Sequence, residues 1–222
     1  MNVVLENLGP IGEAFWSTVL LSVASGIGAL LLGTVLAGMR VSPVPVLRAS
    51  GTLYVNTMRN TPLTLVLLFC GLGLGNTLGL KFSDTVTVNS YWLAVVGLSA
   101  YTASFVCESL RAGINTVPMG QAEAARSIGL TFGQTLTSII LPQAFRSVVG
   151  PLGSVFIALI KNTTIASLIG VAEAAASMRT LIEFNGNAVI PIFLGFALGF
   201  MVLTLPTGFF FGWLSKRLAV AR

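Results

Sequence analysis

The sequence predicts an all-α integral membrane protein with five transmembrane helices. Of its 222 residues, 55% are hydrophobic and only 9% are charged, whereas soluble domains carry about 25% charged residues. Long uncharged stretches recur along the chain, and a helix needs about 20 such residues to cross the hydrocarbon core. Because Glu6 and Glu13 stand where a basic segment would be expected, and the apolar run after them is long, we do not expect a cleaved signal peptide.

The uncharged runs locate the spans in order. Residues 14–39 lie between Glu13 and Arg40 and are rich in Leu, Val, Ala and Gly, so we place the first span there. Pro43 and Pro45 follow it and predict a loop. The same counting places the other four spans at about 53–80, 88–112, 147–170 and 188–212. The whole chain, 1–222, is therefore expected to form a single transmembrane domain.

The basic residues indicate which ends of the spans face the cytoplasm. If the loop after span one, the loop after span three and the C-terminus share one side, the opposite side receives only Lys81 and Arg179. The shared side then holds Arg40, Arg48, Arg111, Arg126, Arg146, Lys216, Arg217 and Arg222. Lys and Arg are enriched in cytoplasmic loops, so we expect the N-terminus outside and the C-terminus in the cytoplasm. Topology and membrane lipid account for the basic charge, and we expect no nucleic acid partner.

The segment 117–144, between spans three and four, is polar enough to lie in water although it contains a long uncharged run. Its apolar residues recur at helical spacing with polar residues between them, which indicates an amphipathic helix rather than a span. Pro118 suits the first position of a helix and Gly129 suits its end. The segment is either a cytoplasmic contact for a protein partner or an amphipathic connector on the lipid headgroups.

A second helix is expected in the same segment. Thr131 and Gln134 have the spacing of a capping box, in which each satisfies a backbone group of the other. We expect this helix to end at Leu141, because Pro142 follows.

Four charged residues fall at membrane depth, where a charge costs roughly 2.5 to 3.5 kcal/mol on insertion scales. Glu108 and Arg111 are three residues apart and are expected to pair. Arg59 either snorkels to the interface or faces the solute path. Lys161 is expected to line the path and to meet an anionic group of the substrate, and its alternatives are capping of backbone carbonyls or pairing with Glu173 or Glu108. The path residues expected on this basis are Arg59, Glu108, Lys161, Asn162, Thr163 and Thr164.

Several classes of chemistry are not supported by the composition. The chain has no His and only seven scattered acidic residues, so we expect neither a catalytic site nor a metal site. Cys70 and Cys107 lie in apolar runs and are interpreted as buried hydrophobic residues. No Gly-rich phosphate loop precedes Lys161, so the chain is not expected to bind ATP. The remaining interpretation is a transporter subunit whose energy comes from a partner protein. The alternative is a secondary transporter or channel for small polar solutes.

Five motifs together resemble the permeases of ATP-binding cassette (ABC) importers for polar amino acids, the histidine, glutamate and glutamine uptake group, and are most similar to actinobacterial glutamate permeases. The resemblance covers about residues 14–217. The motifs are Arg59-Asn60-Thr61-Pro62, Tyr101 with Glu108-Ser109-Leu110-Arg111-Ala112-Gly113-Ile114, Gly120-Gln121, Glu123-Ala124-Ala125 with Gly129 and Ile139-Ile140-Leu141-Pro142, and Lys161-Asn162-Thr163-Thr164.

The resemblance implies a multi-pass protein of the bacterial cytoplasmic membrane that forms the translocation path for a polar amino acid, with glutamate as the expected substrate. It implies two cytoplasmic ATPase subunits that bind ATP and Mg²⁺, a second permease subunit, identical or homologous, and an external solute-binding protein. It also implies that the segment 117–144 is the coupling (EAA) loop that docks on the ATPase. The coupling residues are then Gly120, Glu123, Ala124, Ala125 and Gly129.

Overall fold

The computed structural model describes residues 2–218, and every element in that range is a helix, which confirms the expected all-α class for this part of the chain. Within it, four helical segments are long and apolar enough to cross a membrane, and a bent pair of helices makes a fifth candidate. The four are Leu8–Val41, Val86–Ile114, Phe132–Ile169 and Gly186–Leu218, and the bent pair is Pro45–Asn60 with Leu63–Thr77. Arg222, assigned above to the cytoplasmic side, lies outside the described residues.

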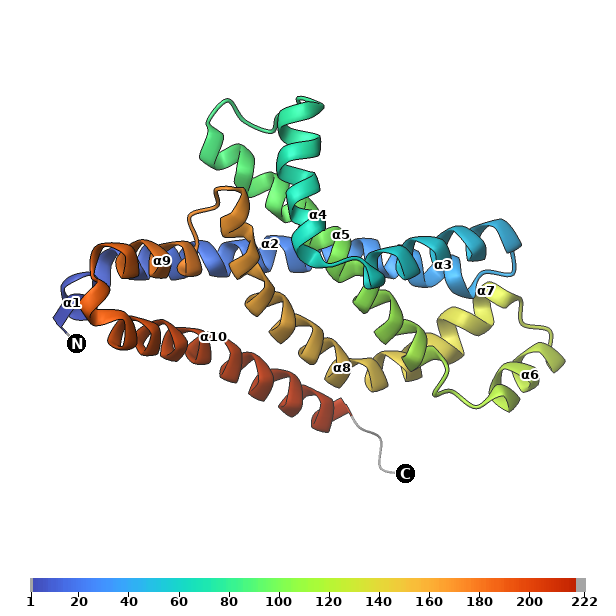
Figure 1. Cartoon of the computed structure of the whole chain (residues 1–222). Coiled ribbons are helices and arrows are strands. Elements are labelled where there is room, and N and C mark those ends of the chain that lie inside the picture. The colour runs from blue at the N-terminus through green and yellow to red at the C-terminus, as the bar shows by residue number, and fades with distance from the viewer. Residues whose placement is uncertain (1, 219–222) are drawn as a thin grey trace.

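Figure 1 shows α2 and α5 crossing the middle of the molecule, with α6 and α7 at the end opposite the N-terminus and α9 lying beside α2. The α-helices are α1 (Asn2–Glu6), α2 (Leu8–Val41), α3 (Pro45–Asn60), α4 (Leu63–Leu68), α5 (Val86–Ile114), α6 (Met119–Ser127), α7 (Phe132–Thr135), α8 (Leu141–Asn162), α9 (Ala174–Phe184) and α10 (Val189–Leu218). The other turns are η1 (Phe69–Thr77) and η2 (Leu136–Ile140), both π-helical, and η3 (Thr163–Ile169) and η4 (Gly186–Ala188), both 3₁₀.

A sharp bend divides the segment expected to form the second span, 53–80. The axes of α3 and the helix formed by α4 and η1 meet at 105°. The cause is Pro62, which has no N–H to donate and disfavours helical backbone at Thr61. Thr61 is accordingly extended, with φ −98° and ψ 132°.

A hydrogen bond links α3 to α5. The Tyr54 hydroxyl of α3 donates to the carbonyl of Ala100 of α5 at 2.9 Å.

The cytoplasmic helix predicted to stop at Leu141 does not stop there, and that prediction is wrong. The helix runs from α7 through η2 into α8 without a break, and it spans 38 residues from Phe132 to Ile169. Pro142 falls in the first turn of α8, directly after the π-helical turn. Such a turn shifts the hydrogen-bond partners of the backbone and accommodates a residue without an N–H. With 38 residues, the segment is longer than the about 20 residues that are needed to cross the hydrocarbon core.

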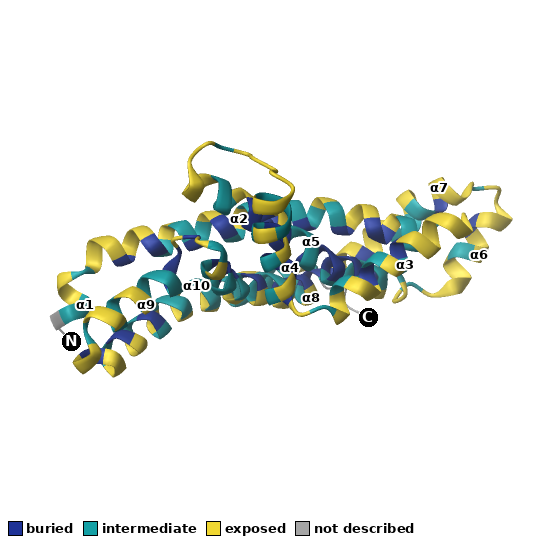
Figure 2. Cartoon of the chain, turned by 45° about the horizontal axis from the view of Figure 1, so that its top comes forward, coloured by how far each residue is buried: buried dark blue, intermediate teal, exposed yellow. Residues whose placement is uncertain are grey.

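The main packing contact is between α2 and α5, with contacts from Ser25 to Arg40 of α2 and from Ser99 to Glu108 of α5. Gly33 allows the close approach, since a Cβ there would lie 2.7 Å from Val106 Cβ and 2.9 Å from the carbonyl oxygen of Ala103. In lipid the hydrophobic effect does not drive helices together, so helices associate through close packing, which small residues at the contact permit. Leu21, Leu67 and other apolar side chains of α2, α4, α5 and α8 form one buried cluster. Figure 2 shows buried residues gathered where these helices cross and exposed ones over α6 and α7.

The contact at Gly33 predicts a position-specific loss of stability. We expect Gly33→Ala to reduce the free energy of unfolding by about 1–3 kcal/mol, because the added methyl group meets backbone and a β-branched side chain. Gly38→Ala is the matched control, since a Cβ on Gly38 of the same helix meets nothing within 4 Å, and it should be neutral or stabilising by up to about 1 kcal/mol. Thermal unfolding of the purified variants in detergent measures both. Equal behaviour of the two variants would contradict this account of the helix contact.

Candidate functional site

A pocket of about 380 Å³ lies between α5 and α8. It is lined by Tyr101, Thr102, Phe105, Ser154, Val155, Ala158 and Asn162. Hydroxyl and amide groups on an otherwise apolar wall can orient a small polar ligand. The Thr102 side chain is almost fully buried, and its Oγ1 atom finds no hydrogen-bond partner among the described residues. Ser154 and Ala158 are exposed, so the pocket opens at the surface of the subunit.

An arginine stands at the Phe105 side of this pocket. The guanidinium carbon of Arg59 lies 5.7 Å from the ring centroid of Phe105, a cation–π contact. Phe105 in turn packs against Tyr101, with ring centroids 5.2 Å apart. The aromatic wall of the pocket therefore connects directly to Arg59, which belongs to α3.

Glu108 lies one turn beyond Phe105 on α5 and contacts three arginines. Arg40 from α2 donates Nη1–H to Glu108 Oε1. Arg59 Nη1 is 3.5 Å from the same oxygen, and Arg111 Nη2 is 3.5 Å from Oε2. The expected pair of Glu108 with Arg111 is thus present, but two arginines from distant parts of the chain join it. Arg40 is nearly buried, whereas Arg59 and Arg111 keep 43% and 40% of their side chains exposed.

The motif at the end of α8 is divided between different environments. Asn162 lines the pocket, whereas Lys161 is exposed and makes no ion pair among the described residues. Thr163 is fully buried and donates to the carbonyl of Ile160 at 2.7 Å. Thr164 donates to the carbonyl of Lys161 at 2.7 Å. Both threonine hydroxyl groups therefore donate to backbone carbonyls of the turn that ends α8. The alternative pairing of Lys161 with Glu173 or Glu108 is not observed.

The pocket residues Thr102, Ser154 and Ala158 were not selected from the sequence. A signal for them exists in the helical spacing: Ser154, Ala158 and Asn162 follow one another every four residues, as do Tyr101 and Phe105. Residues four apart share a helix face. This spacing predicts a face of small and polar residues on α8 and an aromatic face on α5. The sequence does not indicate that these two faces lie against each other.

The segment expected to contact a partner protrudes from the membrane helices as α6 and α7. As predicted, α6 ends before Gly129, which has a φ of +88°, a conformation that favours glycine. The Thr131–Gln134 capping box is also present. Of the expected coupling residues, Ala125 is 5% exposed and packs inward. The outward-facing ones are Gly120, Glu123, Ala124 and Gly129.

Two side-chain contacts join this protruding segment to α8. Gln143 of α8 donates Nε2–H to the Gln121 side chain of α6, and it also donates to the carbonyl of Ile139 at 2.9 Å. The Thr116 hydroxyl, just before α6, donates to the Ser147 hydroxyl at 3.1 Å. These contacts link α6 and the turn before it to the base of the helix that lines the pocket.

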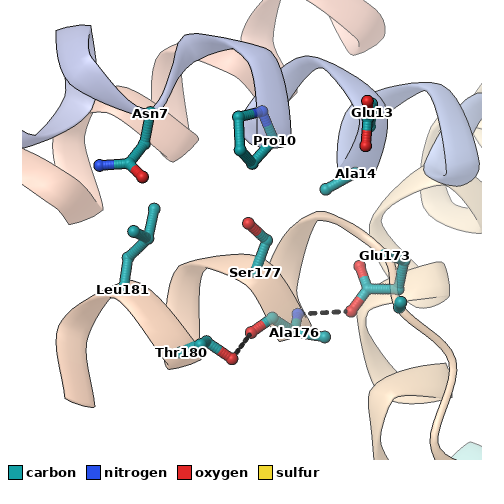
Figure 3. A pocket seen from close by; sticks show the side chains of 10 residues that line it. Asn7, Pro10, Glu13, Ala14, Glu173, Ala176, Ser177, Thr180 and Leu181 are labelled. Carbon is teal, nitrogen blue, oxygen red and sulfur yellow. Dashed lines mark hydrogen bonds between the residues drawn. The ribbon is translucent and has the colours of Figure 1, made fainter. Parts of the chain in front are cut away.

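A second pocket, of about 500 Å³, lies between the start of α2 and α9. Figure 3 shows Glu13 and Ala14 of α2 facing Ser177 of α9 across it, with Glu173 at one end. The Glu173 side chain is fully buried and accepts from the N–H groups of Ala175 and Ala176 at 2.8 and 2.9 Å, capping α9. Burial raises the pKa of the Glu173 carboxyl from 4.5 to about 7, and the two N–H groups offset part of that rise.

Residues 29–220 match the family described as the binding-protein-dependent transport system inner membrane component. The chain is 55% identical to the glutamate transport system permease protein GluC of Corynebacterium glutamicum over all of both chains. It is 36% identical to the probable glutamine ABC transporter permease protein GlnM of Bacillus subtilis, over 98% of this chain and 97% of that one. A chain from the crystal structure of an amino acid ABC transporter with histidines superimposes with a TM-score of 0.85, at 25% identity and 96% coverage of each. A chain of the MetNI methionine ABC transporter shares the fold, with a TM-score of 0.79 at 16% identity.

These matches, together with several helices long and apolar enough to cross a membrane, define a membrane transport subunit. The chain belongs to the family of inner membrane components of binding-protein-dependent transport systems and is the permease subunit of an ABC importer. This confirms the expected multi-pass membrane protein and the expectation of a transport subunit rather than an enzyme. It sets aside the alternative of a secondary transporter or channel. Membership of the family implies an ATPase and a substrate-binding protein as partners.

The raised pKa of Glu173 predicts a dependence of stability on pH. The folded carboxyl holds its proton up to about pH 7, while the unfolded one loses it near 4.5, so the stabilisation is complete below about pH 4.5 and is lost as the pH rises through 7. We expect the unfolding temperature in detergent to fall by several degrees between about pH 5 and pH 7, with a free-energy loss on the order of 3 kcal/mol at most. Glu173→Gln should flatten this slope, whereas Glu183→Gln, an exposed acid on the same helix, should leave it. A slope unchanged by Glu173→Gln would assign the titration to another group.

Proposed function

We propose that this chain forms the translocation path for glutamate in an ABC importer. The observation that carries the proposal is the pocket between α5 and α8, which has an amide and hydroxyl groups on a mainly apolar wall and Arg59 packed on Phe105 at its edge. The exposed Lys161 is next to the pocket residue Asn162 in the sequence. Cationic groups near a polar pocket favour an anionic solute. The 55% identity to a protein named as a glutamate transport permease supports the same substrate.

In the proposed topology the N-terminus lies outside and the C-terminus in the cytoplasm. The distribution of basic residues along the sequence supports this orientation, with eight on the proposed inner side and two on the outer side. The segment 117–144 then lies in the cytoplasm as the coupling loop. Arg126 of α6 and Arg146 near the start of α8 are both exposed there, as expected for residues at the inner surface.

We propose that α6 is the contact for the ATPase. Its outer surface carries the charge of Glu123 between two strongly exposed apolar side chains, Met119 at 78% and Ile128 at 80%. Exposed apolar residues around a polar group are typical of a protein contact. ATP and Mg²⁺ would be bound by two ATPase subunits, and this chain itself would bind no cofactor.

A second permease subunit, identical or homologous, is proposed to complete the path, and an external solute-binding protein to deliver glutamate. The support for a second permease subunit is the pocket itself, because its α8 wall is exposed at Ser154 and Ala158. A solute in an open pocket would meet lipid, and a facing subunit would exclude it. Of the expected path residues, Asn162 lines the pocket, and Arg59 packs against the pocket residue Phe105 and lies 3.5 Å from Glu108. Lys161 is next to Asn162 in the sequence, and Thr163 and Thr164 donate to carbonyls of the turn that ends α8.

The coupling contact predicts that Glu123→Lys abolishes ATP-driven uptake while membrane insertion stays normal. The substitution reverses a charge on an exposed face of α6, so it disturbs a partner contact rather than the fold. Gly129→Asp should act similarly, because the position needs a positive φ. Uptake of labelled glutamate into cells, with the amount of protein in the membrane measured in parallel, tests both. Glu123→Gln is the matched control for the charge reversal. Normal uptake by Glu123→Lys and Gly129→Asp would refute the coupling role.

The pocket predicts different effects for two neighbouring residues. Asn162→Leu should reduce glutamate uptake at least about tenfold, because it removes the amide from the pocket wall and fills space. Lys161→Met should reduce stimulation of the ATPase by glutamate and its binding protein, because it removes the cation that precedes the pocket residue Asn162. Lys81→Met, an exposed lysine far along the chain, is the control. The assembled importer in proteoliposomes gives both readouts, and unchanged uptake and stimulation in Lys161→Met would remove Lys161 from the path.

A further inference from the structure

The charges around Glu108 do not balance. Three guanidinium groups, from Arg40, Arg59 and Arg111, lie within 4 Å of one carboxylate, so the group of four carries a net charge of +2. The Nε atom of Arg111 is buried and has no hydrogen-bond partner among the described residues. A partly buried cluster with excess positive charge and an unused donor attracts a further anion.

Arg59 is the member of this cluster that also reaches the pocket. Its guanidinium packs over Phe105, which lines the pocket, while its Nη1 atom is 3.5 Å from Glu108 Oε1. Charge-assisted hydrogen bonds between nitrogen and a carboxylate oxygen have lengths of about 2.7–2.9 Å. Arg59 is therefore attracted to Glu108 without being hydrogen-bonded to it, and its five N–H groups remain available for a second carboxylate.

The other two arginines hold Glu108 independently of Arg59. Arg40 is nearly buried and hydrogen-bonds Oε1 directly, and Arg111 lies near Oε2 one turn further along α5. If Arg59 turned away toward the pocket, Glu108 would keep two counter-ions. Removing Arg59 from Glu108 thus leaves no uncompensated carboxylate, which is the arrangement that would be strongly unfavourable inside a membrane protein.

We propose that the Glu108 carboxylate occupies, next to Arg59, the place that the substrate carboxylate takes when substrate binds. In the empty pocket it is the counter-ion of Arg59, and an arriving acidic amino acid takes its place on that guanidinium. This inference rests on the proposed function and adds to it the basis of selectivity. The γ-carboxyl group of Glu108 is the same group that the side chain of glutamate carries, so the exchange replaces one carboxylate–guanidinium contact by another. A neutral amino acid lacks a side-chain carboxylate and cannot compete on equal terms for Arg59.

The test is equilibrium binding of glutamate and of glutamine to the permease–ATPase complex in nanodiscs. Glu108→Gln removes the competing carboxylate and keeps the shape of the side chain. We expect it to tighten glutamate binding about fivefold or more, with glutamine binding changed less than about twofold. Arg59→Gln should weaken glutamate binding by a similar factor and again leave glutamine unaffected. In the Arg59→Gln background, Glu108→Gln should have no further effect on glutamate, because the two residues act through one contact.

Several outcomes would overturn the exchange. They are unchanged or weaker glutamate binding in Glu108→Gln, equal tightening of glutamate and glutamine, and additive effects of the two substitutions. If Glu108→Gln does not assemble with the ATPase, Arg59→Gln alone decides, and an unchanged preference for glutamate over glutamine would refute the proposal. Uptake by the wild-type importer separates a failure of the proposed substrate from a failure of the proposed exchange. Failure to transport glutamate refutes the proposed substrate as well, whereas normal glutamate uptake with unaltered binding in Glu108→Gln refutes only the exchange.

Discussion

One carboxylate makes ion pairs with α2 and α3 from its place on α5. Glu108 brings together Arg40 and Arg59, which are on either side of the turn between α2 and α3, with Arg111 of its own helix. In a membrane the hydrophobic effect does not drive helices together, so close packing at Gly33 and the charge cluster have to do so. The cluster also sets where Arg59 lies, and Arg59 is the cation that meets the aromatic wall of the pocket.

The pocket and the protruding helix α6 are joined by α8. The helix from Phe132 to Ile169 is continuous, with a π-helical turn and Pro142 near its base. Gln143 links that base to Gln121 of α6, and Asn162 lines the pocket at the far end of the same helix. The Gln121–Gln143 contact and this helix therefore connect α6 to the α8 wall of the pocket. The sequence predicted instead that the cytoplasmic helix would end at Leu141, which would have separated α7 from α8.

Local features were predictable because their causes lie within a few residues. Gly129 ends α6, and Thr131 with Gln134 caps the next helix, because these residues satisfy backbone groups of their own neighbours. The break at Pro62 and the continuity at Pro142 show the limit of this reasoning. The two prolines have the same covalent constraint, but the backbone is extended at Thr61 before Pro62, whereas the helix continues through Pro142 directly after a π-helical turn. Glu173 was a candidate partner for Lys161 and is instead buried as the cap of α9.

The sequence by itself determined that the chain lies in a lipid bilayer, that it is helical, and where its candidate spans approximately lie. It also contains the motifs that resemble importer permeases. These follow from composition, from the length of uncharged runs and from residues close together in the chain. Only the tertiary structure decided that Glu108 faces three arginines, that a pocket with an amide and hydroxyl groups on its wall lies between α5 and α8, and that Arg59 connects the two. The physical reason is that these contacts join α2, α3, α5 and α8, and the rotation of each helix about its axis is set by packing against the others rather than by its own sequence.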